Sequence, residues 1–153
     1  MAKEALFNIL NNRYYFDELY VLDLFSGTGN ISYEFASRGT EHITAVDADY
    51  GCIKFINTTS ESFQMPIRTL KSDVFKYLES TTEVFDVIFA DPPYEFSIDD
   101  FSKIPQLVFE NKLLSQDGLL VVEHSKHTDL SALQYFKERK NYGGNAFSFF
   151  QHS

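Results

Sequence analysis

Apolar residues along this chain follow two spacings. Compact apolar runs are typical of buried strands, and they alternate with segments whose apolar residues recur every three or four positions, as in helices. The runs predict strands over residues 19–25, 42–46, 67–71, 84–90 and 119–123. The other segments predict helices over 2–10, 31–37, 50–63, 74–79 and 100–114. Pro105 lies either in the first turns of the last helix or at a break in it.

Strands that alternate with helices predict a parallel sheet covered on both faces. The tail departs from this rhythm, because residues 135–142 and 146–151 predict two strands joined by a tight turn at Gly143-Gly144. We therefore expect an α/β, Rossmann-like fold with a seven-stranded, mostly parallel sheet and a C-terminal antiparallel hairpin. No linker or repeat interrupts the pattern, so residues 1–153 are expected to form one domain.

The composition limits the classes of protein. Hydrophobic residues make up 44% and charged residues 23%, as in a folded globular chain. Cys52 is the single cysteine, which excludes an intrachain disulfide and a cysteine-based zinc site. No apolar stretch reaches the length of a membrane span and no leader opens the chain, so we expect a cytoplasmic protein without a membrane partner or metal, and a monomer. The net charge of −9 argues mildly against a nucleic-acid partner on charge alone.

A glycine turn follows the first strand. The segment Asp23-Leu-Phe-Ser-Gly27-Thr-Gly29 lies where an open α/β sheet binds its ligand, and its glycines allow the backbone to approach that ligand closely. The match to the dinucleotide pattern G-x-G-x-x-G is incomplete, because Ser32 occupies the third position. The Asp23 carboxylate could hold an ammonium group or a ribose, or accept from a backbone amide.

Two more acidic residues end the next strands. Asp47 lies 20 residues after Gly27, a spacing at which a carboxylate can accept both hydroxyls of a ribose. The alternative is a helix N-cap, since a helix follows. Asp73 either contacts an adenine amino group or caps the helix over residues 74–79.

The segment Asp91-Pro92-Pro93-Tyr94 directly follows the fourth strand and carries the most specific signal. The prolines lack amide donors and leave backbone carbonyls exposed. The Asp91 carboxylate and the Pro92 carbonyl could then accept both hydrogens of one amino group on a nucleic-acid base. This localises the lone pair of the nitrogen toward a methyl donor, while Tyr94 could stack on the base. The alternative is a simple turn.

On these residues the sequence resembles a known family. VLDLFSGTGNISYEFASRGTEHITAVDAD is similar to motifs I and II of class I methyltransferases, and DPPY to motif IV of enzymes that methylate amino groups. The opening AKEALFNIL and the ending NYGGNAFSFF resemble bacterial 16S ribosomal RNA guanine-N2 methyltransferases of the RsmD type. The resemblance implies a class I methyltransferase domain that methylates the N2 amine of a guanine in ribosomal RNA or the small-subunit particle.

The resemblance also implies roles for individual residues. The methionine side of S-adenosylmethionine would lie against Asp23, Ser26, Gly27 and Gly29, its ribose against Asp47, and its adenine against Asp73 and Val74. Phe25, Ala48 and Asp91 complete the expected cofactor site. The residues expected to be catalytic are Asp91, Pro92, Pro93 and Tyr94.

Other interpretations stay open at this point. A DNA adenine-N6 or cytosine-N4 methyltransferase also uses DPPY, but such enzymes usually carry a separate target-recognition region. A nicotinamide-dependent oxidoreductase leaves DPPY unexplained, and a non-catalytic S-adenosylmethionine-binding domain leaves the intact motifs unexplained. In the family a basic N-terminal arm with a β-hairpin precedes the helix over residues 2–10, and these 153 residues contain no match to it. We therefore expect either a naturally short protein or a truncated one, with weakened affinity for RNA.

Overall fold

A computed structural model describes residues 2–153. Its helices are α1 (Ala2–Asn11), the short 3-10 helix η1 (Phe16–Glu18), α2 (Asn30–Ser37), α3 (Tyr50–Ser62), α4 (Val74–Ser80) and α5 (Ile98–Glu110). Its strands are β1 (Tyr20–Leu24), β2 (His42–Asp47), β3 (Ile67–Lys71), β4 (Phe85–Ala90), β5 (Leu114–Ser125), β6 (Phe136–Tyr142) and β7 (Asn145–Phe150).

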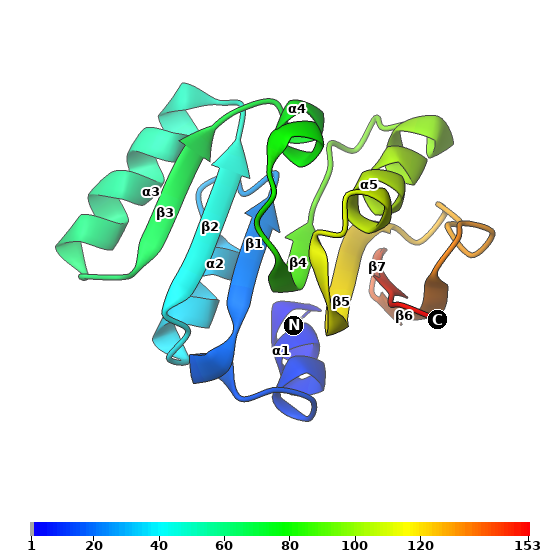
Figure 1. Cartoon of the computed structure of the whole chain (residues 1–153), viewed down its shortest axis with the longest axis horizontal. Coiled ribbons are helices and arrows are strands. Elements are labelled where there is room, and N and C mark those ends of the chain that lie inside the picture. The colour runs from blue at the N-terminus through cyan, green and yellow to red at the C-terminus, as the bar shows by residue number, and fades with distance from the viewer. Residues whose placement is uncertain (1) are drawn as a thin grey trace.

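The strands form one seven-stranded sheet within residues 2–153, in the order β3-β2-β1-β4-β5-β7-β6 (Figure 1). The first five strands pair in parallel. The hairpin strand β7 pairs antiparallel with both β5 and β6. The predicted α/β sheet with a C-terminal antiparallel hairpin is therefore confirmed, and the turn between β6 and β7 contains Gly143, with φ of +61°.

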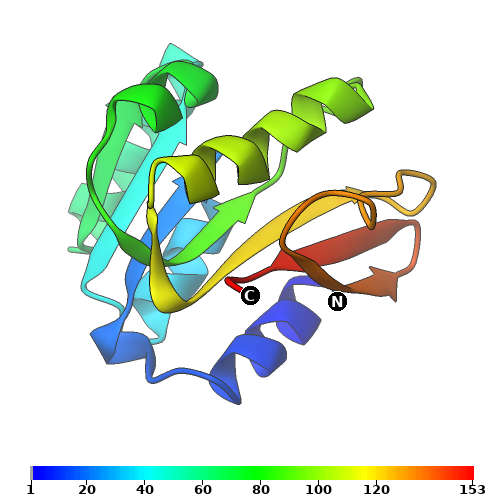
Figure 2. The same cartoon turned by 45° about the vertical axis from the view of Figure 1, so that its right-hand side comes forward.

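Helices cover both faces of the sheet, as Figure 2 shows for α1 below it and for α4 and α5 above it. Successive strand residues point to opposite faces, so Val87 packs with α1 and α2 while Ile88 packs with α4 and α5. On the first face, Phe7, Phe16 and Phe35 form an aromatic group with ring centroids 4.7–5.9 Å apart. Many of the 16 phenylalanines of the sequence are thus core residues.

The predicted bounds of two elements, α5 and β5, differ from the observed ones by more than one residue. Helix α5 begins at Ile98 and not at residue 100, because Ser97 and Asp100 form a capping box in which each side chain accepts from the backbone amide of the other. The helix ends at Glu110, and Leu114 already belongs to β5. Strand β5 is longer than the predicted 119–123, because its start pairs with Phe85 across a register shift in β4.

Pro105 lies in the interior of α5 without breaking it. A proline there removes one backbone hydrogen bond. Its ring is buried within the α5 layer, and Phe101 and Ile104 on the same helix are buried as well. Packing against the sheet therefore keeps the helix continuous through this position.

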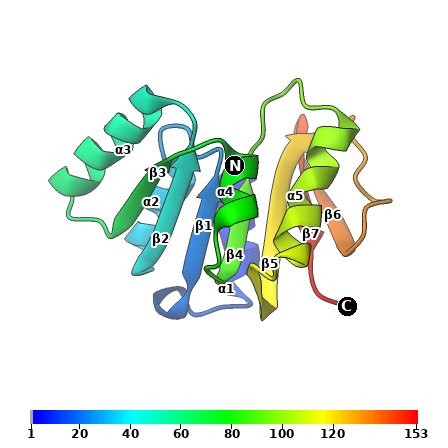
Figure 3. The same ribbon diagram turned by 45° about the horizontal axis from the view of Figure 1, so that its top comes forward.

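The carboxyl ends of the parallel strands meet at one edge of the sheet. Figure 3 shows the arrowheads of β2 and β5 at this upper edge, together with the loop that leads into α5. The glycine turn after β1, Asp47 at the end of β2 and the Asp-Pro-Pro-Tyr segment after β4 all belong to this edge. The topology therefore gathers the sequence motifs in one place.

Candidate active site

A cavity of about 500 Å³ lies at the carboxyl edge of the sheet, and we call it the edge cavity. Loops and element ends that follow β1, β2, β3 and β4 all contribute to its wall. Its lining residues are Phe25, Asp47, Ala48, Asp49, Asp73, Val74, Phe75, Asp91, Pro93 and Phe96. A volume of this size is ordinary for a small-molecule site. Seven of the residues expected at the site from sequence thus share one cavity, although they come from four separate parts of the chain.

The glycine turn after β1 has an unusual backbone. Phe25, Gly27 and Gly29 all have positive φ angles, of 56°, 56° and 96°. The φ angle of Gly29 favours glycine, and a Cβ atom there would lie 2.9 Å from the ring of Tyr33, so the Tyr33 side chain would have to shift. A Cβ atom on Gly27 would meet no atom within 4 Å, so the backbone there faces open space.

Asp47 connects the loop after β2 to the glycine turn. Its Oδ2 atom accepts a hydrogen bond from the Gly27 amide at 2.9 Å, and its Oδ1 atom accepts one from the Asp49 amide at 2.9 Å. The N-cap of α3 is Asp49, whose carboxylate accepts from the Cys52 amide. The alternative interpretation of Asp47 as a helix cap was therefore wrong, because the neighbouring aspartate has that role.

Asp73 is the N-cap of α4 and also lines the edge cavity. Its Oδ2 atom accepts a hydrogen bond from the Lys76 amide at 3.0 Å. The capping alternative is thus confirmed for this residue, and it does not remove Asp73 from the cavity wall. Val74, the first residue of the helix, lies in the same wall.

Asp23 does not line the edge cavity. Its side chain is 1% exposed, and its carboxylate accepts a hydrogen bond from the Ser32 hydroxyl at 2.7 Å. Burial raises the pKa of Asp23 to about 7, and the negative charges of Asp91 and Asp47 contribute to the rise, while the bond from Ser32 opposes it. Ser32, which replaces the third glycine of the dinucleotide pattern, is thus the partner of a buried carboxyl group.

Ser26, Gly27 and Gly29 also lie outside the wall of the edge cavity as the structure describes it. The Oγ atom of Ser26 is buried and has no hydrogen-bond partner among residues 2–153. A buried hydroxyl without a partner is uncommon in folded proteins, and a bound ligand commonly supplies the missing bond.

The Asp91-Pro92-Pro93-Tyr94 segment leaves β4 as an irregular chain. The Pro93 carbonyl accepts a hydrogen bond from the Phe96 amide at 3.1 Å. The Pro92 carbonyl has no such partner among the described residues, although the proline ring itself is buried. Tyr94 is 89% exposed, so its ring stands in solvent beside the segment. This segment therefore carries a carboxylate, a carbonyl without a hydrogen bond to the described residues and an exposed aromatic ring within four consecutive positions of the same chain segment.

A second cavity, of about 210 Å³, lies on the other side of this segment, and we call it the side cavity. Asp91 and Pro93 line both cavities, so they form the partition between them. The further lining residues of the side cavity are Pro92, Tyr94, Phe101, Glu123, His124, Ser125, Thr128 and Asn145. A group held in the side cavity would therefore meet a ligand of the edge cavity at Asp91 and Pro93.

The electrostatics of the partition were not expected from sequence. Asp91 as a residue is exposed, but partial desolvation of its carboxyl group raises its pKa to about 6, and the negative charge of Glu123 adds to this effect. His124 lies next to Glu123 in β5, and burial lowers the pKa of its imidazole. Its Nδ1 atom contacts the Ser125 carbonyl, so Nδ1 carries the hydrogen and Nε2 accepts from the Ser148 hydroxyl. The imidazole is therefore a neutral part of the wall.

Several lining residues had not been predicted. Phe96 stacks on Phe75 with ring centroids 5.9 Å apart and meets Phe25 edge to face at 5.5 Å, which gives the edge cavity an aromatic wall. The position of Glu123 at the site could have been predicted from sequence, because a carboxylate at the end of a buried parallel strand lies at the carboxyl edge of the sheet. The position of Asn145 could not, since it reaches the site only through the pairing of β7 with β5.

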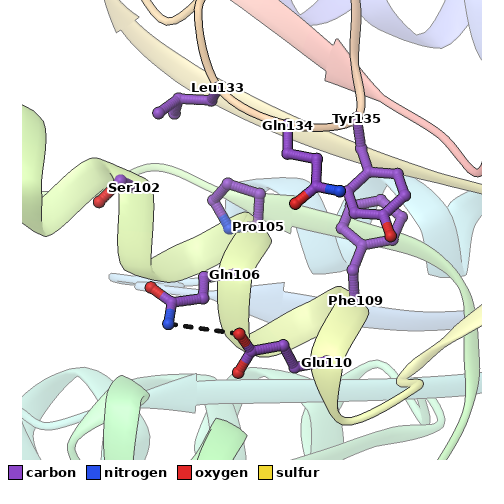
Figure 4. Close-up of a pocket in the computed structure, with 8 residues that line it drawn as sticks. All are labelled: Ser102, Pro105, Gln106, Phe109, Glu110, Leu133, Gln134 and Tyr135. Carbon is purple, nitrogen blue, oxygen red and sulfur yellow. Dashed lines mark hydrogen bonds between the residues drawn. The ribbon is translucent and has the colours of Figure 1, made fainter.

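A third cavity, of about 350 Å³, lies between α5 and residues 133–135 (Figure 4). Its main feature is the stacking of Phe109 on Tyr135, with ring centroids 4.1 Å apart. Gln106 and Glu110 form a hydrogen bond along its helical side. None of the motif residues lines this cavity, and it contains no grouping of acid, base and nucleophile.

Residues 2–153 contain neither a candidate metal site nor a candidate membrane-spanning helix. No group of three or more histidine, cysteine or acidic side chains there is placed to hold a metal ion. None of the helices in that range is both long enough and apolar enough to cross a membrane.

The sheet order, the glycine turn and the Asp-Pro-Pro-Tyr segment at the carboxyl edge define a methyltransferase with a Rossmann-like fold. More particularly, the chain belongs to the family described as "conserved hypothetical protein 95", whose model matches residues 1–151. The predicted relationship to the RsmD type is confirmed by this match and by the relatives below.

Two named relatives illustrate the family, and one solved structure shares the fold. "Putative rRNA methyltransferase YlbH" of Bacillus subtilis is 31% identical over 134 residues, which cover 84% of this chain and 71% of that protein. "Ribosomal RNA small subunit methyltransferase D" of Haemophilus influenzae is 28% identical over 142 residues, which cover 84% of this chain and 67% of that protein. The crystal structure of a "putative methylase" from Haemophilus influenzae has a TM-score of 0.83 at 24% identity, over 98% of this chain and 95% of that one.

Proposed function

We propose that this protein transfers a methyl group from S-adenosylmethionine to the exocyclic N2 amine of a guanine in small-subunit ribosomal RNA, and that residues 1–153 form one methyltransferase domain. The observation that carries the proposal is the position of Asp91 and Pro93 between two cavities. One cavity has the size and walls for a nucleoside cofactor, and the other opens beside an exposed aromatic ring that suits a base. Two relatives named for the methylation of ribosomal RNA support the choice of substrate.

The residues present fit S-adenosylmethionine. The buried Ser26 hydroxyl lacks a partner, and the space next to Gly27 is open, so both can receive the methionine part. Asp47 would hold the ribose with the lone pairs that the Gly27 and Asp49 amides leave free. Asp73 and Val74 would contact the adenine, together with the aromatic wall that includes Phe75 and Phe96.

Charge supports the same ligand. Four carboxylates line the edge cavity, and among them only Asp47, Asp49 and Asp73 have backbone amides as partners. Asp91 and Asp47 also act on the buried Asp23, whose pKa they raise further. Such a site favours a cation, because positive charge relieves the repulsion among the carboxylates. S-adenosylmethionine carries a sulfonium and an ammonium group, whereas nicotinamide dinucleotides carry an anionic pyrophosphate.

The cofactor would supply an electrophilic methyl group, and the residues of the partition would prepare the amine. The Asp91 carboxylate and the Pro92 carbonyl would each accept one hydrogen of the amino group. This holds the nitrogen in place and directs its lone pair toward the edge cavity. As positive charge grows on the nitrogen these two bonds strengthen, so they stabilise the transition state more than the bound substrate. Asp91 is also placed to accept the proton that the nitrogen must lose.

Tyr94 would hold the base itself. An amino group inside a duplex is out of reach for a recessed site, so enzymes of this kind act on flipped or unpaired bases. The exposed ring of Tyr94 beside the side cavity offers a face for stacking.

Two experiments test the proposal. Calorimetry on the full-length protein should detect binding of S-adenosylmethionine and much weaker binding of NAD; tight binding of NAD alone would contradict it. Deletion of the gene, followed by mass-spectrometric mapping of ribosomal RNA, should remove a single N2-methylguanine from the small subunit. Loss of an N6-methyladenine or N4-methylcytosine instead would keep the chemistry and refute the guanine target.

A further inference from the structure

Two carboxylates from neighbouring strands face the side cavity. Asp91 directly follows β4, and Glu123 lies near the end of β5. Ala90 and Val122 are paired in register, so the two carboxylate residues that follow them lie at adjacent positions on the sheet edge. Partial desolvation raises the pKa of Asp91, and the negative charge of Glu123 adds to this rise, as expected for two carboxylates that lie near each other. The role proposed above uses Asp91 and leaves Glu123 without a function.

Glu123 is held in place by a neutral partner. The Asn145 side-chain amide donates a hydrogen bond to its Oε2 atom at 2.9 Å. Within residues 2–153, its Oε1 atom has no hydrogen bond and no lysine, arginine or histidine forms an ion pair with it. A half-buried carboxylate usually pairs with a cation when its role is structural. Here one oxygen is fixed and the other is available to a ligand.

The bases that carry an amino group differ in the atom beside that group. In guanine the 2-amino group lies next to the ring N1–H, which is a donor. In adenine the 6-amino group lies next to N1, and in cytosine the 4-amino group lies next to N3, and both of these ring nitrogens are acceptors. A second carboxylate beside the amine site therefore attracts guanine and repels adenine and cytosine, since a hydrogen bond needs a donor opposite an acceptor.

We propose that Glu123 selects guanine by accepting a hydrogen bond from the ring N1–H, and that Asn145 is the positioning residue that directs its free oxygen toward the base. This inference rests on the proposed function, because it assumes that the base occupies the side cavity with its amino group at Asp91. It adds to that function the reason why an amine-methylating site takes one base and rejects the others.

The test compares guanine with 2-aminopurine at the target position of an RNA fragment. 2-Aminopurine keeps the 2-amino group but has an unprotonated N1, which is an acceptor. The full-length wild-type protein should methylate the guanine RNA with the higher kcat/KM. In Glu123→Gln the side chain can present an amide donor to N1 of 2-aminopurine. The ratio of kcat/KM values for the two RNAs should then move toward 2-aminopurine by at least about 10-fold, the scale of one well-formed base contact.

Controls separate base reading from other roles. Asn145→Ala should shift the same ratio in the same direction by a smaller factor, because it releases Glu123 without removing it. Glu61→Gln on the exposed side of α3 should leave the ratio unchanged. An unchanged melting temperature of Glu123→Gln establishes that the fold is intact. If Glu123→Gln lowers kcat/KM for both RNAs equally, the inference is wrong while the proposed function stands. If the wild type methylates adenine or cytosine and no guanine, the proposed function fails as well.

Discussion

The backbone amide of Gly27 donates a hydrogen bond to the Oδ2 atom of Asp47, with the nitrogen and oxygen 2.9 Å apart. The bond joins the glycine turn after β1 to the end of β2, and these are the two loops expected to hold the two ends of one cofactor. Ser26 adds a second link, since its amide donates to the Val46 carbonyl at 3.1 Å. Asp47 therefore fixes the shape of the site as well as contacting the ligand.

We expect Asp47→Ala to weaken S-adenosylmethionine binding by about 1.5–3 kcal/mol, the usual contribution of hydrogen bonds to a charged group. The loss should appear as a higher Kd in calorimetry, with kcat at saturating cofactor less affected. The control is Glu41→Ala, at the amino end of β2, which should leave the Kd unchanged. An unchanged Kd for Asp47→Ala would mean that this carboxylate only organises the loops.

Asp91→Asn should lower kcat by on the order of 10²-fold or more, since it removes an interaction made mainly in the transition state. Asparagine keeps the size and one acceptor oxygen, but its NH₂ group opposes the incoming amine. The Kd for S-adenosylmethionine should change much less. Asp117→Asn, an exposed position in β5 toward its amino end, is the matched control. Methylation of saturating RNA at the wild-type rate by Asp91→Asn would show that the segment is only a turn.

The pKa of Asp91 predicts a pH profile. The carboxylate accepts the amine only when ionised, and partial desolvation together with Glu123 raises its pKa to about 6. The value of kcat/KM should therefore be constant above about pH 7 and fall roughly tenfold per pH unit below pH 6. Glu123→Gln removes one cause of the raised pKa, so its profile should fall at a lower pH. A profile that is flat down to pH 5 in the wild type would contradict this assignment.

Tyr94→Ala should raise KM for RNA, because stacking of a base on an aromatic ring contributes about 1–3 kcal/mol. Tyr94→Phe keeps the ring and should be nearly silent. Tyr15, another strongly exposed tyrosine, precedes η1 and β1 at the opposite edge of the sheet, so Tyr15→Ala should not change KM. Equal losses for the alanine and phenylalanine variants of Tyr94 would instead assign the role to the hydroxyl group.

The buried carboxyl group of Asp23 should make the free energy of unfolding depend on pH. Burial raises its pKa from 3.8 to about 7, so between these pH values the folded state binds more protons than the unfolded state. Stability from this group is therefore highest at low pH and falls, by about 4 kcal/mol, as pH rises through the window. Asp23→Asn removes the charge. The free energy of unfolding of the variant minus that of the wild type should thus be larger at pH 8 than at pH 5, so the variant gains relative stability as pH rises.

Urea denaturation at the two pH values measures this difference. Asp86→Asn is the matched control, because the Asp86 carboxylate also accepts from a serine hydroxyl, Ser115, but is only half-buried. The variant Asp86→Asn gives the pH dependence that follows from replacing a half-buried, hydrogen-bonded carboxylate, and the pH dependence of Asp23→Asn should exceed it. If the two variants show the same pH dependence, the Asp23 carboxyl group is not buried in the charged form.

Much of the fold followed from local pattern. The alternation of apolar runs and helical spacing predicted β3 at its observed bounds, and α1, α2 and β2 to within one residue at either end. The start of α5 was missed because it depends on a reciprocal bond between Ser97 and Asp100 that apolar periodicity does not register. The length of β5 was missed because it depends on pairing with β4 and β7.

The grouping of the motif residues at one site could also be predicted from local sequence. Residues such as Asp47 and Asp91 end parallel strands, and parallel strands end at the same edge, so the sequence alone determined that they would come together. The tertiary structure decided what surrounds them. Desolvation gave Asp23 and Asp91 their raised pKa values, and packing of the chain after Tyr94 brought Phe96 against Phe75.

The contact between Glu123 and Asn145 shows most clearly what the sequence pattern could not predict. The two residues are 22 positions apart, and they meet because the hairpin folds β7 back between β5 and β6. The spacing of apolar residues predicts which side of a helix or strand is buried, and this spacing is set by residues close together in the sequence. Strand register, the partner of a polar side chain and the solvent around a carboxylate depend on residues distant in sequence, so only the folded chain determines them.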